Sequence, residues 1–206
     1  MRHSWLCSGI LVTLAVTGVP SLHSQTGTQK TGEQIRASFD THKGEFDYLL
    51  GDWEFTAVSR EWGDLRGRWS AVRLAEGQIL DEYRILGDSG ETYYVTTTLR
   101  AYNAVLDRWE LVGMDAGNGL NDVGTGKRVG GEVHIEQKFG VMSATPSIWR
   151  IRYYDIRADG FSWVAARSTD GGKTWLEDYQ KIETRRIGPA RSLGALTPAV
   201  TASAKP

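Results

Sequence analysis

Residues 45–186 alternate hydrophobic and polar side chains in short runs, and glycine, asparagine or aspartate separates one run from the next. In the run Glu132–Phe139, for example, Val133 and Ile135 alternate with charged residues. A period of two places successive side chains on opposite faces of a β-strand. Because no helical pattern between the runs is long enough for a parallel crossover, the strands are expected to be antiparallel.

The predicted strands are rich in β-branched and aromatic residues. They are expected over residues 53–59, 66–75, 78–86, 91–102, 108–115, 123–129, 132–139, 148–158, 161–167 and 174–185. Short connections between consecutive strands favour an up-and-down barrel over a Greek-key sandwich. A barrel of about ten strands is wider than the eight-stranded barrel that side chains can just fill, so a cavity is expected inside it. An outer-membrane barrel is less consistent with the pattern, because both faces of the hairpin over 148–167 carry charge.

The segments that flank this domain have a different composition. Residues 1–24 combine a basic start, an apolar run from Trp5 to Val19 and small residues before Ser24. This pattern predicts a signal peptide with cleavage near Ser24, and hence a periplasmic or secreted protein. The alternative is a retained N-terminal anchor, although the run is short for a membrane span. Cys7 is the only cysteine, so the mature chain is expected to have no disulfide and no cysteine-ligated metal.

Residues 25–44 are polar, with a short helix expected around 33–39, and residues 187–206 are predicted to form a disordered tail rich in Pro, Ala, Ser and Thr. The formal net charge of −1 gives no electrostatic reason to expect binding to nucleic acid or to an anionic membrane surface. A hydrophobic content of 40% with eight tryptophans is sufficient for a core.

Three segments together carry a family resemblance: Phe46–Glu54, Gln78–Tyr83 and Ser168–Trp175. In this order they resemble an uncharacterised bacterial secreted family of lipocalin-like (calycin-type) barrels, over residues 46–185. The opening Leu49-Leu50-Gly51-x-Trp53 is also similar to that of the nitrobindins, which are ten-stranded calycin-like barrels. The resemblance implies a barrel with a ligand cavity and implies no particular reaction.

A nitrobindin-type site would make His134 a haem ligand, and an enzyme would use it as a general base. The alternation instead places His134 with Glu132, Glu136 and Lys138 on the polar, outer face of its strand. The only other histidine within or next to the domain is His42, and the histidine that a nitrobindin carries in a C-terminal strand is absent. We therefore expect no haem and no other cofactor.

Two further motifs are interpreted as structural. The sequence Ser168-x-Asp170-x-Gly172-x-Thr174-Trp175 matches the Asp-box hairpin of sialidase propellers, but it occurs once here, whereas a propeller needs it in every blade. It is expected to be a turn in which the carboxylate holds loop amides. Glycines 124, 126 and 130 lack the strand–helix context of a phosphate-binding loop.

The pair Asp159-Gly160 favours a two-residue hairpin turn, which would set Arg152 opposite Arg167 and Tyr154 opposite Ala165. One face of the hairpin would then hold Arg150, Arg152, Tyr154, Trp163 and Arg167, and the other face Trp149, Ile151 and Tyr153. If the arginine face points inward, the arginines would bind a ligand anion. If it points outward, which the cost of burying charge favours, the lumen is lined by Trp149, Ile151, Tyr153 and their neighbours and suits an apolar ligand.

These observations predict an exported barrel that binds a small, apolar or amphipathic molecule in its lumen, with no metal ion. The alternative is a barrel enzyme that uses Asp81, Glu82, Tyr83 or Asp115 for acid–base chemistry. No nucleophile–base constellation is visible in the sequence. Self-association through the two-faced aromatic strands is a further possibility.

Overall fold

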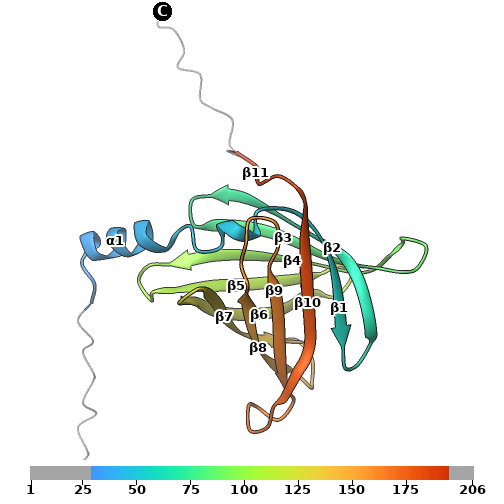
Figure 1. The fold of residues 1–206 in the computed structure, drawn as a ribbon. Helices are drawn as coiled ribbons and strands as arrows, with labels where there is room; N and C mark the ends of the chain where they lie inside the picture. Colours follow the sequence, from blue (N-terminus) through green and yellow to red (C-terminus); the bar gives the residue numbers. More distant parts are fainter. Residues whose placement is uncertain (1–28, 195–206) are drawn as a thin grey trace, which may run out of the picture.

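A computed structural model describes residues 29–194, in which ten antiparallel strands close into one barrel (Figure 1). The strands are β1 (Gly51–Ser59), β2 (Gly63–Ala75), β3 (Gln78–Leu86), β4 (Thr92–Asn103), β5 (Arg108–Asp115), β6 (Gly119–Val129), β7 (Glu132–Phe139), β8 (Ser147–Tyr154), β9 (Ser162–Ser168) and β10 (Leu176–Gly188). Each strand pairs with the next along the chain, and β1 pairs with both β2 and β10. The predicted up-and-down barrel is therefore confirmed.

The C-terminal end of the domain lies beyond the predicted boundary. Strand β10 continues to Gly188, and β11 (Arg191–Ser192) adds a short parallel pairing to β2. Residues 187–188 and 191–192, which the sequence placed in a disordered tail, therefore belong to the sheet. The predicted signal peptide and residues 195–206 lie outside the described residues.

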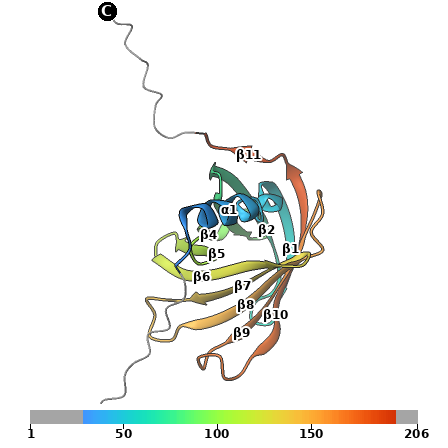
Figure 2. The same cartoon turned by 90° about the vertical axis from the view of Figure 1, so that its left-hand side faces the viewer.

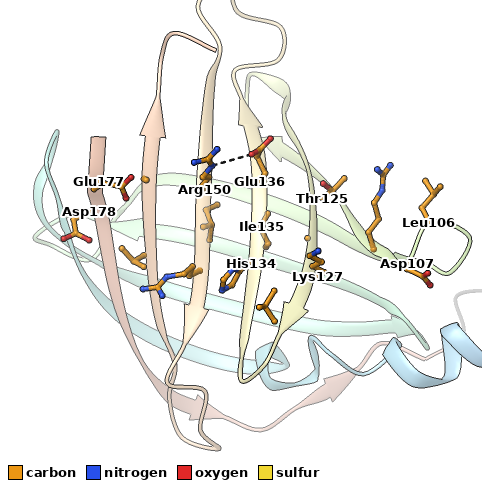
Figure 3. A pocket seen from close by; sticks show the side chains of 17 residues that line it. Leu106, Asp107, Thr125, Lys127, His134, Ile135, Glu136, Arg150, Glu177 and Asp178 are labelled. Carbon is orange, nitrogen blue, oxygen red and sulfur yellow. Dashed lines mark ion pairs between the residues drawn. The ribbon is translucent and has the colours of Figure 1, made fainter. Parts of the chain in front are cut away.

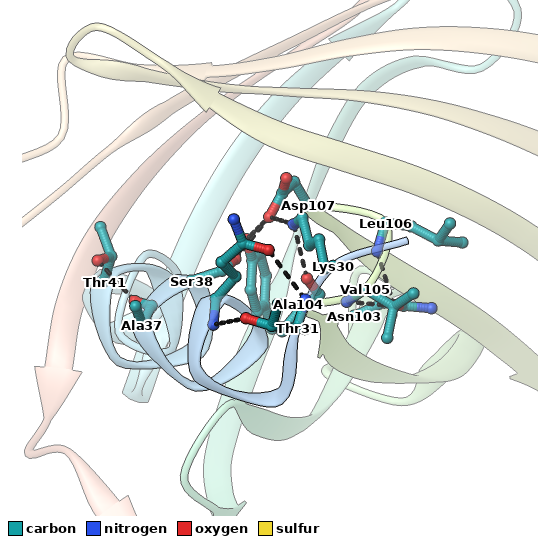
Figure 4. Close-up of polar contacts among 12 residues, drawn as sticks. Lys30, Thr31, Ala37, Ser38, Thr41, Asn103, Ala104, Val105, Leu106 and Asp107 are labelled. Carbon is teal, nitrogen blue, oxygen red and sulfur yellow. Dashed lines mark hydrogen bonds and ion pairs between the residues drawn. The ribbon is translucent and has the colours of Figure 1, made fainter. Parts of the chain in front are cut away.

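Helix α1 (Gly32–His42) lies at one end of the barrel (Figure 2). Thr31 and Gln34 form a capping box at its start, in which each side chain accepts a hydrogen bond from the other residue's backbone N–H. Ser38 and Lys30 both bind the carboxylate of Asp107, in the connection between β4 and β5 (Figure 4). Within residues 29–194, no helix is long and apolar enough to cross a membrane.

The end of the barrel next to α1 is filled by aromatic side chains. Phe46, just before the 3₁₀ helix η1 (Asp47–Leu49), packs edge-on against Trp109 with ring centroids 4.9 Å apart. Trp53 and Phe161 pack in the same manner at 5.0 Å. These four side chains are at most 1% exposed. This half of the barrel is thus a solid core that side chains alone fill.

The pairing of β8 with β9 differs from the predicted hairpin. Tyr153 lies opposite Trp163, Ile151 opposite Ala165, and Trp149 opposite Arg167. The prediction that Arg152 opposes Arg167 is therefore wrong. The true register differs by an odd number of residues, so Trp163 and Arg167 move to the face that carries Trp149, Ile151 and Tyr153.

The loop that connects β8 to β9 makes contacts with β10 and with the core, and these contacts explain the difference. The Phe161 ring lies in the aromatic core, and its backbone N–H donates to Thr184 Oγ1 at 2.8 Å. A Cβ on Gly160 would lie 2.8 Å from the carbonyl oxygen of Thr184, so glycine here permits close approach to β10. A type I′ turn needs a positive φ at both of its central residues. Neither Asp159 nor Gly160 has a positive φ, so this turn does not form.

Candidate functional site

A cavity of about 440 Å³ occupies the half of the barrel away from α1. It reaches the surface, because Trp62 and Tyr93 at its rim are 54% and 81% exposed. Its volume lies in the range typical of small-molecule sites. The lining residues come from both ends of the sheet and from the middle: Glu61, Trp62, Leu65, Trp69, Asp81, Tyr83, Ile85, Tyr93, Tyr94, Thr96, Thr98, Arg100, Asp122, Gln137, Phe139, Ser147, Trp149, Ile151, Tyr153, Trp163, Arg167, Tyr179, Gln180 and Ile182.

Aromatic side chains form much of the cavity wall. Trp149 packs between Phe139 and Tyr179, with centroid distances of 4.7 and 4.9 Å. Tyr83 stacks on Phe55 at 4.7 Å and meets Trp69 edge-on at 5.4 Å. Such a wall buries apolar ligand surface while leaving the ring edges available for weak polar contacts.

A buried ion pair contributes to the inner part of the cavity lining. The Asp81 carboxylate accepts from Arg100 Nε at 2.5 Å, from Arg100 Nη2 at 3.3 Å and from the Trp69 indole N–H at 2.9 Å. The two charged side chains are 1% and 4% exposed. Burial lowers the pKa of Arg100, but the adjacent Asp81 carboxylate outweighs this effect and raises it. The two side chains carry opposite charges, so the pair is electrically neutral as a unit.

A second ion pair lies at the rim. Arg167 Nη1 contacts Glu61 at 2.7 Å and donates to the Tyr179 hydroxyl at 2.8 Å, and that hydroxyl also donates to Glu61. Burial, helped by the hydrogen bond to Glu61, raises the pKa of Tyr179 to about 12. This network joins β9 and β10 to the β1–β2 hairpin, so it links neighbouring parts of the barrel wall at the rim.

Asp122 on β6 is the third lumenal carboxylate and is 2% exposed. It accepts from the side-chain amides of Gln137 and Asn121. Burial raises its pKa above the ordinary value, against the hydrogen bond from Gln137. A Cβ on Gly113 would lie 2.0 Å from Asp122 Oδ2, so only glycine at position 113 leaves space for this carboxylate.

Five of the eight sequence-predicted ligand-binding candidates line the cavity, and three do not. Those inside are Trp149, Ile151, Tyr153, Trp163 and Arg167. Arg150, Arg152 and Tyr154 are on the outer face of β8, where Arg152 lies over the ring of Tyr154 at 5.3 Å. The structure thus separates Arg152 from Arg167, and the pair of arginines that the anion-binding alternative required does not form.

The outer side of the barrel bears a hollow of about 730 Å³ that extends from the start of β5 across β6–β9 to β10 (Figure 3). Arg150 pairs there with Glu136 at 3.7 Å, and His134 pairs with Glu132 at 2.7 Å. His134 lies on this outer side, as the alternation predicted. Both cations and anions line the hollow, so it presents no single sign of charge.

The turn from Ser168 to Trp175 is held by the side chain of Asp170. Its carboxylate accepts from the backbone N–H of Lys173 and Thr174 at 3.0 Å and from the Thr174 hydroxyl at 2.6 Å. The hydroxyl of Ser168 accepts from the Gly172 N–H at 2.9 Å, and the Trp175 indole donates to the Gly172 carbonyl at 3.0 Å. Hydrogen bonds from Thr174 lower the pKa of Asp170 to about 2.

The four acid–base candidates from the sequence are dispersed. Asp81 is in the ion pair with Arg100, and Glu82 on the outer face pairs with Arg84. Tyr83 lines the cavity, and burial raises its pKa. Asp115 accepts from the Tyr94 hydroxyl at 2.7 Å. No two of these four groups hydrogen-bond to each other within residues 29–194.

Sequence reasoning missed Arg100, Asp122 and Gln137. A signal was present for Gln137, which shares the face of Val133 and Ile135 in an otherwise alternating strand. A polar residue on an apolar face indicates either a strand end or a polar contact inside the fold. No group of three or more His, Cys, Asp or Glu side chains suited to a metal ion occurs in the described part of the chain.

Comparisons with known proteins find similar solved structures but no family. No protein-family model and no curated protein matches the chain. Among solved structures, the crystal structure of Rv2717c from M. tuberculosis is similar, with a TM-score of 0.48 and 14% sequence identity over 69% of this chain and 95% of that chain. These findings assign no family, so the functional proposal below rests on the residues of this chain.

Proposed function

We propose that this protein is an exported, lipocalin-like barrel that binds a small apolar or amphipathic molecule in its lumen. The observation that carries the proposal is the cavity of about 440 Å³, which reaches the surface and is walled by aromatic side chains. A cavity of this kind gives a ligand a large apolar contact area and a few polar groups for orientation.

The lumen is partly empty for a structural reason. Aromatic packing fills the end next to α1, whereas the charged pairs Asp81–Arg100 and Glu61–Arg167 hold the other half together through its walls. Both pairs lie along the wall, Asp81–Arg100 between the paired strands β3 and β4, and the centre of this half is left as the cavity.

Export and family membership are parts of the same proposal. Export is supported by the basic start, the apolar run and the small residues before Ser24. N-terminal sequencing of the protein recovered from the periplasm of an expressing bacterium tests it, with Gln25 as the expected first residue. A mature protein that still begins at Met1 would contradict it.

A matched pair of variants tests lumenal binding. Thr98 lines the cavity and is 7% exposed, whereas Thr97 lies on the outer side of the same strand. Thr98→Phe places a phenyl ring in the lumen, and Thr97→Phe places the same ring outside. The probe is N-phenyl-1-naphthylamine, which is uncharged at pH 7.5 and fluoresces in apolar surroundings.

We expect saturable binding of one probe per chain, weakened about tenfold or more by Thr98→Phe and unchanged by Thr97→Phe. Circular dichroism and thermal unfolding show whether each variant is folded. A folded Thr98→Phe protein that binds as the wild type does would exclude the lumen as the site.

Acid–base catalysis is the second candidate, and one observation favours it. A lumenal catalyst needs a carboxyl with a raised pKa, and Asp122 has one. Native mass spectrometry of the protein purified from periplasm identifies any bound molecule, and the free molecule is then incubated with fresh protein. Recovery of the molecule unchanged supports binding alone, whereas a mass change that Asp122→Asn abolishes supports catalysis.

A further inference from the structure

The charged groups that line the cavity do not balance. They are Glu61, Asp81, Arg100, Asp122 and Arg167. Asp81 pairs with Arg100 and Glu61 pairs with Arg167. Among residues 29–194, no cation forms an ion pair with Asp122. One buried carboxylate is therefore left with neutral partners only.

The local structure fixes Asp122 at this place. It projects from β6 between Gly113 on β5 and Gln137 on β7, and both strands pair with β6 around it. The amides of Gln137 and Asn121 each donate to one of its oxygens, at 3.4 Å for Asn121. Each carboxylate oxygen accepts more than one hydrogen bond, so Asp122 keeps acceptor capacity toward the lumen.

Neighbouring charges do not compensate Asp122 either. Arg100 attracts it, but Asp81 and Asp115 repel it, and the guanidinium of Arg100 is already hydrogen-bonded to Asp81. A buried ionised group without a counter-ion is costly, and this cost is removed when a cation reaches it. A ligand anion would find both lumenal arginines already in contact with carboxylates, with only Arg100 Nη1 and Arg167 Nε left without a hydrogen-bond partner among the described residues.

We propose that the natural ligand is an amphipathic amine, whose ammonium group binds the Asp122 carboxylate while its apolar part packs against the aromatic wall at Trp149 and Trp163. The inference rests on the proposed lumenal binding function and adds the chemical class of the ligand. An ammonium–carboxylate hydrogen bond is about twice as strong as a neutral one, so charge discriminates amines from neutral molecules of the same shape.

A matched set of three probes separates the amine inference from lumenal binding itself. Decylamine, decanol and decanoate share one chain length and differ in head-group charge, and each is tested below its micelle concentration by displacement of N-phenyl-1-naphthylamine at pH 7.5. We expect decylamine to bind about tenfold or more tightly than decanol, and decanoate to bind most weakly.

Two charge-neutralising variants complete the test. Asp122→Asn keeps the shape of the side chain and removes its charge, and Glu136→Gln makes the same change on the outer face of β7. In Asp122→Asn, the preference for decylamine over decanol should fall to within about threefold while decanol binding is retained, which also shows that the lumen is intact. Glu136→Gln should keep the wild-type preference.

The possible failures are distinguishable. If decanol and decylamine displace the probe equally well, or if decanoate binds best, the amine inference is wrong and lumenal binding stands. If Glu136→Gln abolishes the preference as Asp122→Asn does, the discrimination arises from surface charge and the inference is again wrong. If the probe itself does not bind the wild-type protein, the proposed function fails.

Discussion

Removal of the Asp81 carboxylate should destabilise the barrel far more than removal of any surface carboxylate. Asp81 is 1% exposed and is the acceptor for two hydrogen bonds from Arg100 and one from Trp69. In Asp81→Asn the Arg100 guanidinium remains buried with no counter-charge. Arginine keeps its proton in proteins, so the guanidinium stays charged in the folded variant.

The magnitude follows from the burial of both partners. Breaking a buried pair by removal of one partner costs about 3–5 kcal/mol in free energy of unfolding, because the other charge is left uncompensated. For a domain of this size such a loss corresponds to a fall in Tm of roughly 10–15 °C. Replacement of both partners, as in Asp81→Leu with Arg100→Met, should cost much less than Asp81→Asn, because neither charge of the pair is left without its partner.

Urea unfolding followed by circular dichroism and tryptophan fluorescence measures these free energies. Glu82→Gln is the matched control, since Glu82 is the next residue on β3 and forms a half-exposed pair with Arg84. Its cost should be at most about 1 kcal/mol. The reasoning would be refuted if Asp81→Asn cost no more than Glu82→Gln, or if the double variant cost the sum of its single changes.

Two further predictions concern the connections between strands. Gly160→Ala should lower the free energy of unfolding by about 1–3 kcal/mol, because its Cβ would press on the Thr184 carbonyl 2.8 Å away; Gly131→Ala, with no atom within 4 Å, should be close to neutral in the same urea titration. For Asp170→Asn, the Tm deficit relative to wild type should be complete above about pH 4 and shrink as pH falls through about 2, because the folded-state pKa of Asp170 lies at about 2, below its ordinary value of 3.8. A Tm deficit that stays constant from pH 5 to pH 2 would show that the carboxylate charge of Asp170 does not stabilise the turn.

Most strand positions could be predicted because they depend on local pattern. The spans Gln78–Leu86, Arg108–Asp115 and Glu132–Phe139 coincide with β3, β5 and β7. Alternation over eight or nine residues, bounded by turn residues, is a property of the segment itself. The closure of the sheet into a barrel followed from short connections and from the number of strands.

The β8–β9 register could not be predicted from its local turn signal. Asp159-Gly160 has the composition of a tight hairpin turn, but Phe161 gains more from burial among the aromatic side chains at the closed end. The resulting loop reverses which face of β9 points inward. For the same reason, only some of the candidate lining residues could be identified: the choice of lumenal face for β9 depended on contacts with β10 and the core.

The sequence alone determined that this chain forms an antiparallel barrel of about ten strands with a short helix before it, because period-two alternation and turn composition act over a few residues. The tertiary structure decided which half of the barrel is filled and which charges meet inside it. Arg100 pairs with Asp81 across two strands, whereas Asp122 finds only amides and the space left by Gly113. Such pairings depend on the register of several strands at once, and no single strand's sequence encodes them.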